Sequence, residues 1–120
     1  ETQAMVATFV EHYEAGRARW RTLLTEWRAA GRRVVLWGGG SKGVAFLTTL
    51  GEAAADVAYA VDINPIKTGT FMAGTGQEIV APAFLRDYRP DVVVIMNPVY
   101  RDEITADLNA LGLSPEILTL

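Results

Sequence analysis

The sequence contains no cysteine and only one histidine, His12. Without cysteine, the chain has neither a disulfide nor a cysteine-ligated zinc or iron–sulfur site. A single histidine cannot supply a metal site or a catalytic triad by itself. No apolar run approaches the roughly 20 residues of a membrane span, and no signal-peptide pattern is recognisable. We therefore expect a cytoplasmic protein with no membrane contact.

Positive charge is too sparse for a nucleic-acid-binding surface. Lys and Arg number 11 against 14 Asp and Glu, which gives a net charge of −3. Six arginines outweigh four glutamates through Arg33, whereas the remainder carries five basic residues against ten acids. Neither part has the dense basic patch of a nucleic-acid-binding protein, so we expect no nucleic-acid partner.

Length and composition indicate one compact domain. The chain has 120 residues, of which 50% are hydrophobic and 21% charged, values close to those of an average soluble domain. Such a chain buries roughly two-thirds of the surface that its unfolded form exposes, enough for one core. Position 1 is Glu rather than Met, so we expect a piece of a longer protein.

The hydrophobic spacing predicts a long helix followed by alternating strands and helices. Apolar residues three or four apart, from Met5 to Trp27, predict an amphipathic helix that ends at Gly31. Helical spacing returns over residues 43–50, 82–88 and 100–111. Runs rich in β-branched and aromatic residues predict strands at 33–37, 57–61, 78–80, 91–96 and 117–120.

This alternation predicts an α/β, three-layer, Rossmann-like fold. Right-handed crossovers then give a mainly parallel sheet of about five strands in the order 3-2-1-4-5. We interpret residues 1–31 as a helix connected to an upstream domain that is missing here. Residues 32–120 form the nucleotide-binding part, and the two together make one structural domain.

The segment after the first predicted strand fits a phosphate-binding loop. Gly38, Gly40 and Gly43 match G-x-G-x-x-G and lie between a strand and a helix, as that motif requires. The free N–H groups at the start of the helix attract an anion, and Ser41 and Lys42 add a hydroxyl and a positive charge. A tight strand-to-helix turn can be glycine-rich without binding anything, but this context favours phosphate binding.

Two interpretations remain open for the end of the second strand. Asp62 follows Gly43 by nineteen residues, where dinucleotide-binding folds place an acid that binds ribose. Asp62, Asn64 and Pro65 also fit an ordinary turn. Lys67 either faces an anion or is simply solvated.

Asn97 and Tyr100 follow the fourth predicted strand at its carboxyl end, which lines the ligand crevice of an open α/β sheet. The Asn97 amide can bind a ligand and the Tyr100 ring can stack on one. Alternatively, Asn97 makes a turn and Tyr100 caps the following helix. No set of residues in the sequence looks like a catalytic centre.

Four segments, taken in order, resemble the C-terminal domain of the S-adenosylmethionine-dependent sugar C-methyltransferases. They are residues 40–43, 61–65 with Lys67 and Gly69, 74–82 and 90–98. The resemblance covers nearly the whole chain. Gly39 stands where the family leads us to expect Ala or Ser, a difference that should loosen the loop slightly.

The resemblance implies a substrate-holding role. Full enzymes of this family have a cysteine-rich zinc part, a central domain that binds S-adenosylmethionine, and this C-terminal domain. The domain here would bind no cofactor and hold the nucleoside diphosphate of a nucleotide-linked deoxysugar, while the upstream domain supplies the methyl donor and the catalytic groups. The implied contacts are the pyrophosphate with Gly38–Gly43, Ser41 and Lys42, the sugar nucleotide with Asp62, Asn64 and Lys67, and the opposite side of the crevice with Asn97 and Tyr100.

Three alternatives compete with this interpretation. The glycine loop and Asp62 would serve equally well in a free-standing NAD- or CoA-binding module with a regulatory role. A complete methyltransferase is disfavoured because the chain has room for only about five strands. A structural scaffold whose first helix docks a partner would bind no nucleotide.

Overall fold

The computed structural model describes residues 18–38 and 40–119 as a five-stranded sheet with helices on both faces. The strand order is β3-β2-β1-β4-β5, and all four neighbouring pairs are parallel. The predicted α/β class and the order 3-2-1-4-5 are therefore confirmed. The strands are β1 (Val34–Trp37), β2 (Val57–Val61), β3 (Glu78–Val80), β4 (Val92–Ile95) and β5 (Glu116–Thr119).

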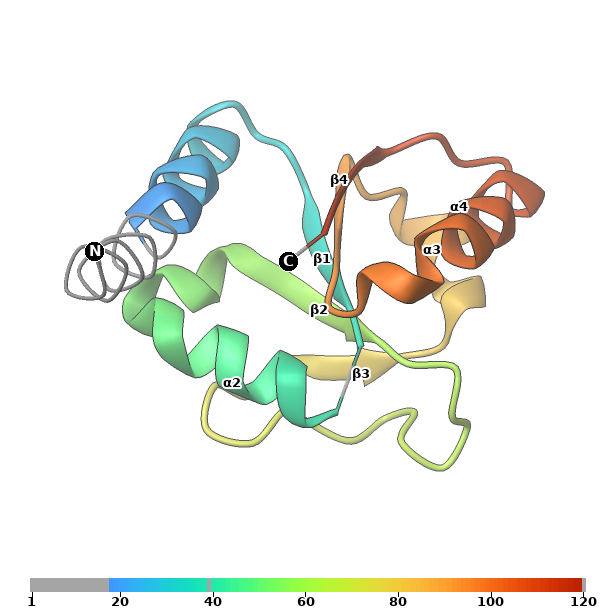
Figure 1. Cartoon of the computed structure of the whole chain (residues 1–120), viewed down its shortest axis with the longest axis horizontal. Helices are drawn as coiled ribbons and strands as arrows, with labels where there is room; N and C mark the ends of the chain where they lie inside the picture. The colour runs from blue at the N-terminus through green and yellow to red at the C-terminus, as the bar shows by residue number, and fades with distance from the viewer. Residues whose placement is uncertain (1–17, 39, 120) are drawn as a thin grey trace, which may run out of the picture.

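Helices cover the two faces of the sheet in separate groups (Figure 1). One group is a helix over residues 18–29 with α2 (Ser41–Leu50) and the 3₁₀ turn η1 (Gly51–Asp56). The other is α3 (Leu85–Tyr88) and α4 (Arg101–Ala110), each preceded by a 3₁₀ turn, η2 (Pro82–Phe84) and η3 (Pro98–Tyr100).

The predicted boundaries of β2 and β3 coincide with the structure, and those of the other described elements differ by at most three residues. The predicted helix over 82–88 divides into η2 and the four-residue α3, with Pro82 in the first turn, where its missing N–H costs nothing. Helix 18–29 ends before Gly31, whose φ of 72° suits the predicted stop. The earlier half of that predicted helix, with His12, lies outside the described residues, as do Gly39 and Leu120.

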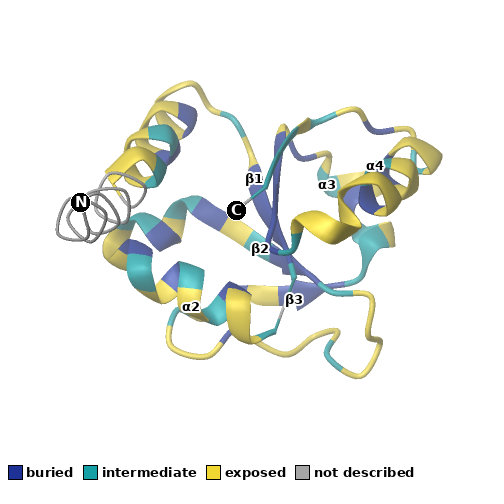
Figure 2. Cartoon of the chain, in the orientation of Figure 1, coloured by how far each residue is buried: buried dark blue, intermediate teal, exposed yellow. Residues whose placement is uncertain are grey.

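Two hydrophobic cores lie on opposite faces of the sheet. Every residue of β1 and β4 is buried, so these central strands contribute to both cores (Figure 2). The pleat sends Leu36 to the core under α2 and helix 18–29, and Val35 to the core under α3 and α4. The apolar run of β4 is thus buried on both faces, as is typical of a central strand in a parallel sheet.

Because the strands are parallel, their carboxyl ends meet at one edge of the sheet. Four connections leave that edge: the glycine loop before α2, the long loop over 62–77, Ala81 between β3 and η2, and the turn that leads into η3. Much of the long loop is exposed (Figure 2). Within the described part of the chain, no helix is both long and apolar enough to cross a lipid bilayer.

Candidate functional site

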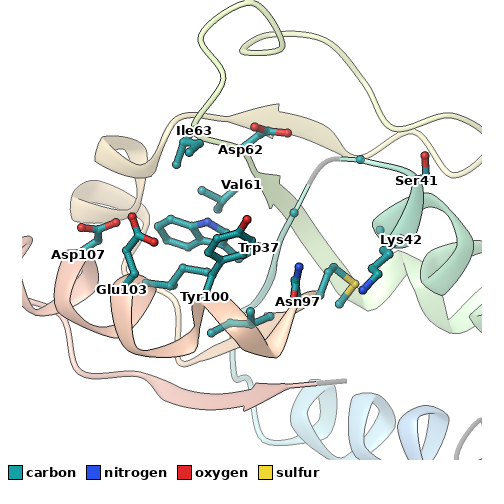
Figure 3. A pocket seen from close by; sticks show the side chains of 16 residues that line it. Trp37, Ser41, Lys42, Val61, Asp62, Ile63, Asn97, Tyr100, Glu103 and Asp107 are labelled. Carbon is teal, nitrogen blue, oxygen red and sulfur yellow. The ribbon is translucent and has the colours of Figure 1, made fainter.

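A cavity of about 470 Å³ opens at the carboxyl ends of β1, β2 and β4 (Figure 3). The glycine loop and the start of α2 form one end of its lining, and α4 contributes to the other. The last residues of the strands make an apolar floor consisting of Trp37, Val61 and Ile95, joined by Ile104 of α4. Its size is typical of a small-molecule site at the switch point of an α/β sheet.

Packing within the chain requires glycine at two of the three motif positions, Gly38 and Gly43. Gly38 has a φ of 132°, and a Cβ there would lie 3.1 Å from the Cβ and Cγ atoms of Met96. A Cβ at Gly43 would lie 2.2 Å from the carbonyl oxygen of Gly38, which no small adjustment relieves. Gly43 therefore lets α2 begin against the end of β1, the packing role that the motif assigns to its third glycine.

Gly40 differs, because a Cβ there would meet no atom within 4 Å. Its φ of −92° is accessible to any residue. Gly40 is the N-cap of α2, where no side chain caps the helix and no acidic residue occupies the first turn. The open space beside Gly40 thus lies next to N–H groups that α2 itself does not satisfy.

Ser41 and Lys42 follow Gly40 in the cavity wall, and both are exposed. Figure 3 shows them together at the α2 end of the cavity. The Lys42 ammonium group makes no ion pair or hydrogen bond with another described residue. This end of the cavity therefore combines a positive charge with the start of a helix, an arrangement that attracts anions.

Asp62 lines the cavity and also organises a turn. Its Oδ1 accepts a hydrogen bond of 2.9 Å from the Asn64 N–H, and its Oδ2 lies 3.7 Å from Lys67 Nζ. The Asn64 side chain in turn accepts a bond of 3.1 Å from the Ile66 N–H. Asn64 and Lys67 do not line the cavity. Asn64 and Lys67 therefore belong to the turn after β2, the second interpretation that the sequence allowed.

Asn97 and Tyr100 line the cavity from the turn after β4. The Asn97 side-chain oxygen accepts a bond of 3.1 Å from the Val99 N–H, so it fixes the start of η3. The Tyr100 side chain makes no capping bond to α4, and the residue is 52% exposed. Eight of the ten predicted site residues therefore share one cavity, and the exceptions are Asn64 and Lys67.

Sequence reasoning missed the contribution of α4. Glu103 and Asp107 line the cavity on the same side as Tyr100 and Ile104. Spacings of three and four residues place these side chains on one face of a helix. The spacing is visible in the sequence. Which side of α4 faces the cavity is fixed only by packing, so the sequence could not indicate it.

The described residues contain no cluster of three or more side chains suited to hold a metal ion. The cavity instead offers hydrogen-bonding groups, an apolar floor, one ammonium group and three carboxylates. The ammonium group is that of Lys42 at the α2 end, and the carboxylates are those of Asp62, Glu103 and Asp107.

Comparison with known proteins gives one family match and a structural likeness. A family model described as the C-methyltransferase C-terminal domain matches residues 1–113. Among curated proteins, none gives a significant match. Solved structures with a similar fold include that of RSP, a Rex-family repressor, with a TM-score of 0.50 and 15% identity over 74% of this chain. This chain covers 52% of that one, about half its length, and the likeness concerns the fold alone.

Proposed function

Because the chain belongs to the C-methyltransferase C-terminal domain family, we propose that it is the substrate-holding part of an S-adenosylmethionine-dependent sugar C-methyltransferase. In this proposal its cavity binds the nucleoside diphosphate of a nucleotide-linked deoxysugar in the cytoplasm. The methyl donor, the catalytic groups and a structural zinc belong to an upstream part of a longer protein. This chain binds and orients the substrate without a cofactor of its own.

The observation that carries the proposal is the α2 end of the cavity. The open space at Gly40, the uncapped start of α2 and the Lys42 ammonium group lie together there. A pyrophosphate carries negative charge and accepts hydrogen bonds, so it complements this group of donors. The open space at Gly40 also allows an oxygen to approach the backbone closely.

The rest of the cavity suits a nucleoside. Its floor of Trp37, Val61 and Ile95 is buried, which gives an apolar surface for a flat base or a sugar face. Tyr100 stands at this floor with half of its surface exposed (Figure 3). Its ring offers a stacking surface without further rearrangement of the chain.

An NMR titration of the 120-residue chain with thymidine 5′-diphosphate tests the proposal. We expect shifts at Gly38, Gly40 and Asp62, and none with S-adenosylmethionine. Replacing Lys42 by Met should weaken binding about tenfold, because a charge-assisted contact to phosphate is lost. The control is Arg86→Met, which removes one positive charge from the exposed surface of α3. Equal affinities for the two variants, or no binding by the unaltered chain, would contradict the proposal.

A second candidate is an NAD- or CoA-binding module with a regulatory role. The observation that favours it is Asp62, which directly follows β2 and lines the cavity where dinucleotide-binding folds place a ribose-binding acid. This candidate predicts tighter binding of NAD or CoA than of thymidine 5′-diphosphate. The same titration, repeated with each of these ligands, separates the two candidates.

A further inference from the structure

The charged side chains that line the cavity are separated by sign. Lys42 lies at the α2 end, whereas Glu103 and Asp107 lie together on α4 at the opposite end (Figure 3). A third carboxylate, that of Asp62, comes from the end of β2. The two acids on α4 are four residues apart, which places them one above the other on the same helix face.

The carboxylates of Glu103 and Asp107 have no partners of their own. Neither makes a side-chain hydrogen bond or ion pair with another residue in the described ranges, 18–38 and 40–119. Asp62 differs, because the Asn64 N–H and the Lys67 ammonium group partly offset its charge. The α4 end of the cavity therefore presents two acceptor groups whose negative charge no described side chain compensates.

Stabilisation of the α4 helix accounts for only one of these two acids. Glu103 is in the first turn of α4, where a carboxylate stabilises the positive end of the helix dipole. Asp107 lies beyond the first turn, where this stabilisation has faded. An exposed aspartate there, next to another unpaired acid and lining a cavity, offers nothing to helix stability.

We propose that the cavity selects ligands whose negative charge is confined to one end, with phosphate at the Gly40–Lys42 end and an uncharged, hydrogen-bond-donating part beside Glu103 and Asp107. This inference rests on the proposed function and adds a rule for which nucleotides enter. Hydroxyl and amino groups donate to the two carboxylates. A phosphate at that end meets two like charges, whose repulsion is strongest at low ionic strength.

On this inference, nucleotides that carry a second phosphate on the ribose bind more weakly. The sharpest probe pair is thymidine 5′-diphosphate and its 3′-phosphorylated derivative, which differ by one phosphate on the ribose 3′-oxygen. For the unaltered chain, we expect the added phosphate to weaken binding about tenfold at low ionic strength, and less at high salt. In the double variant Glu103→Gln, Asp107→Asn, we expect the two ligands to bind within about twofold of each other.

The matched control is Glu52→Gln, Asp87→Asn. It changes the net charge of the chain equally and alters exposed acids that do not line the cavity. It should keep the tenfold preference, whereas loss of the preference in both double variants would indicate an effect of overall charge and overturn the inference. Equal binding of the two ligands by the unaltered chain would overturn the inference and leave the proposed function intact. Failure of thymidine 5′-diphosphate to bind at all would overturn both.

Discussion

The amino ends and the carboxyl ends of the parallel strands form two opposite sides of the sheet, which we call the amino edge and the carboxyl edge. Charged residues interact differently at the two. At the amino ends of the strands, Arg32 and Glu116 form an ion pair of 3.1 Å. The backbone N–H of Arg33 donates a bond of 2.7 Å to the Asp91 carboxylate. The Arg33 guanidinium donates a bond of 2.6 Å to the Tyr88 carbonyl oxygen and lies 5.1 Å from the centre of the Tyr88 ring.

At the carboxyl ends, Lys42, Glu103 and Asp107 line a cavity without described partners. Large apolar side chains are also exposed near this edge: Ile63 is 73% exposed and Val99 82%. At the amino edge, these interactions of Arg32, Arg33, Asp91 and Glu116 join strands and loops to one another. The contrast supports our proposal that Lys42 and the acids of α4 interact with a ligand.

The strongest test of this contrast compares two glycines of one loop. Gly43→Ala places a Cβ against the Gly38 carbonyl oxygen, and we expect it to lower the free energy of unfolding by about 3 kcal/mol. Gly40→Ala meets open space, so its free energy of unfolding should stay within about 0.5 kcal/mol of the unaltered value.

Denaturant unfolding measures both values, and a titration with thymidine 5′-diphosphate completes the test. Gly40→Ala should bind the nucleotide about tenfold more weakly, because its methyl group occupies the space that we assign to a phosphate oxygen. Unchanged nucleotide binding by Gly40→Ala would show that this open space is not part of the site. The proposal that a ligand binds at the carboxyl edge would then lose its main observation.

A smaller effect is expected at the amino edge. Asp91→Ala removes the carboxylate that accepts from the Arg33 N–H, and we expect a loss of about 1 kcal/mol in the free energy of unfolding. Nucleotide affinity should not change, because Asp91 lies at the opposite edge of the sheet from the cavity. The counterpart is Asp107→Asn, which should leave the unfolding free energy nearly unchanged, because Asp107 lies beyond the first turn of α4. If Asp91→Ala weakens nucleotide binding as strongly as Lys42→Met does, the contrast between the amino edge and the carboxyl edge is wrong.

The sequence alone predicted the fold better than the site, for a physical reason. The α/β class follows from the alternation of strand and helix patterns, which is a local signal, and right-handed crossovers then limit the strand orders that are possible. The distinction between Gly38 and Gly40 depends on Met96, which is far away in sequence and reaches the loop only when β4 pairs with β1. The acids of α4 were missed likewise, because their role depends on the face that α4 turns toward the crevice.

The smallest expected effect is a pH dependence of the free energy of unfolding. It involves Tyr88, at the amino edge. Burial raises the pKa of the Tyr88 phenol above its ordinary value of 10.0, Arg33 opposes this, and Tyr59 and Asp91 add to it. The folded chain therefore holds this proton more tightly than the unfolded chain does. The resulting stabilisation is complete below the ordinary pKa and is lost as pH rises through the folded-state value.

Unfolding in urea between pH 8 and pH 11 should therefore show a steeper alkaline loss of stability for the unaltered chain than for Tyr88→Phe. Phenylalanine keeps the ring that Arg33 covers and that packs against Tyr59, so packing at neutral pH should change little. Equal alkaline slopes would mean that Tyr88 does not couple its proton to folding. The pH dependence would then have to come from other groups, and the amino edge would stabilise the fold only through the ion pair and hydrogen bonds of Arg32 and Arg33.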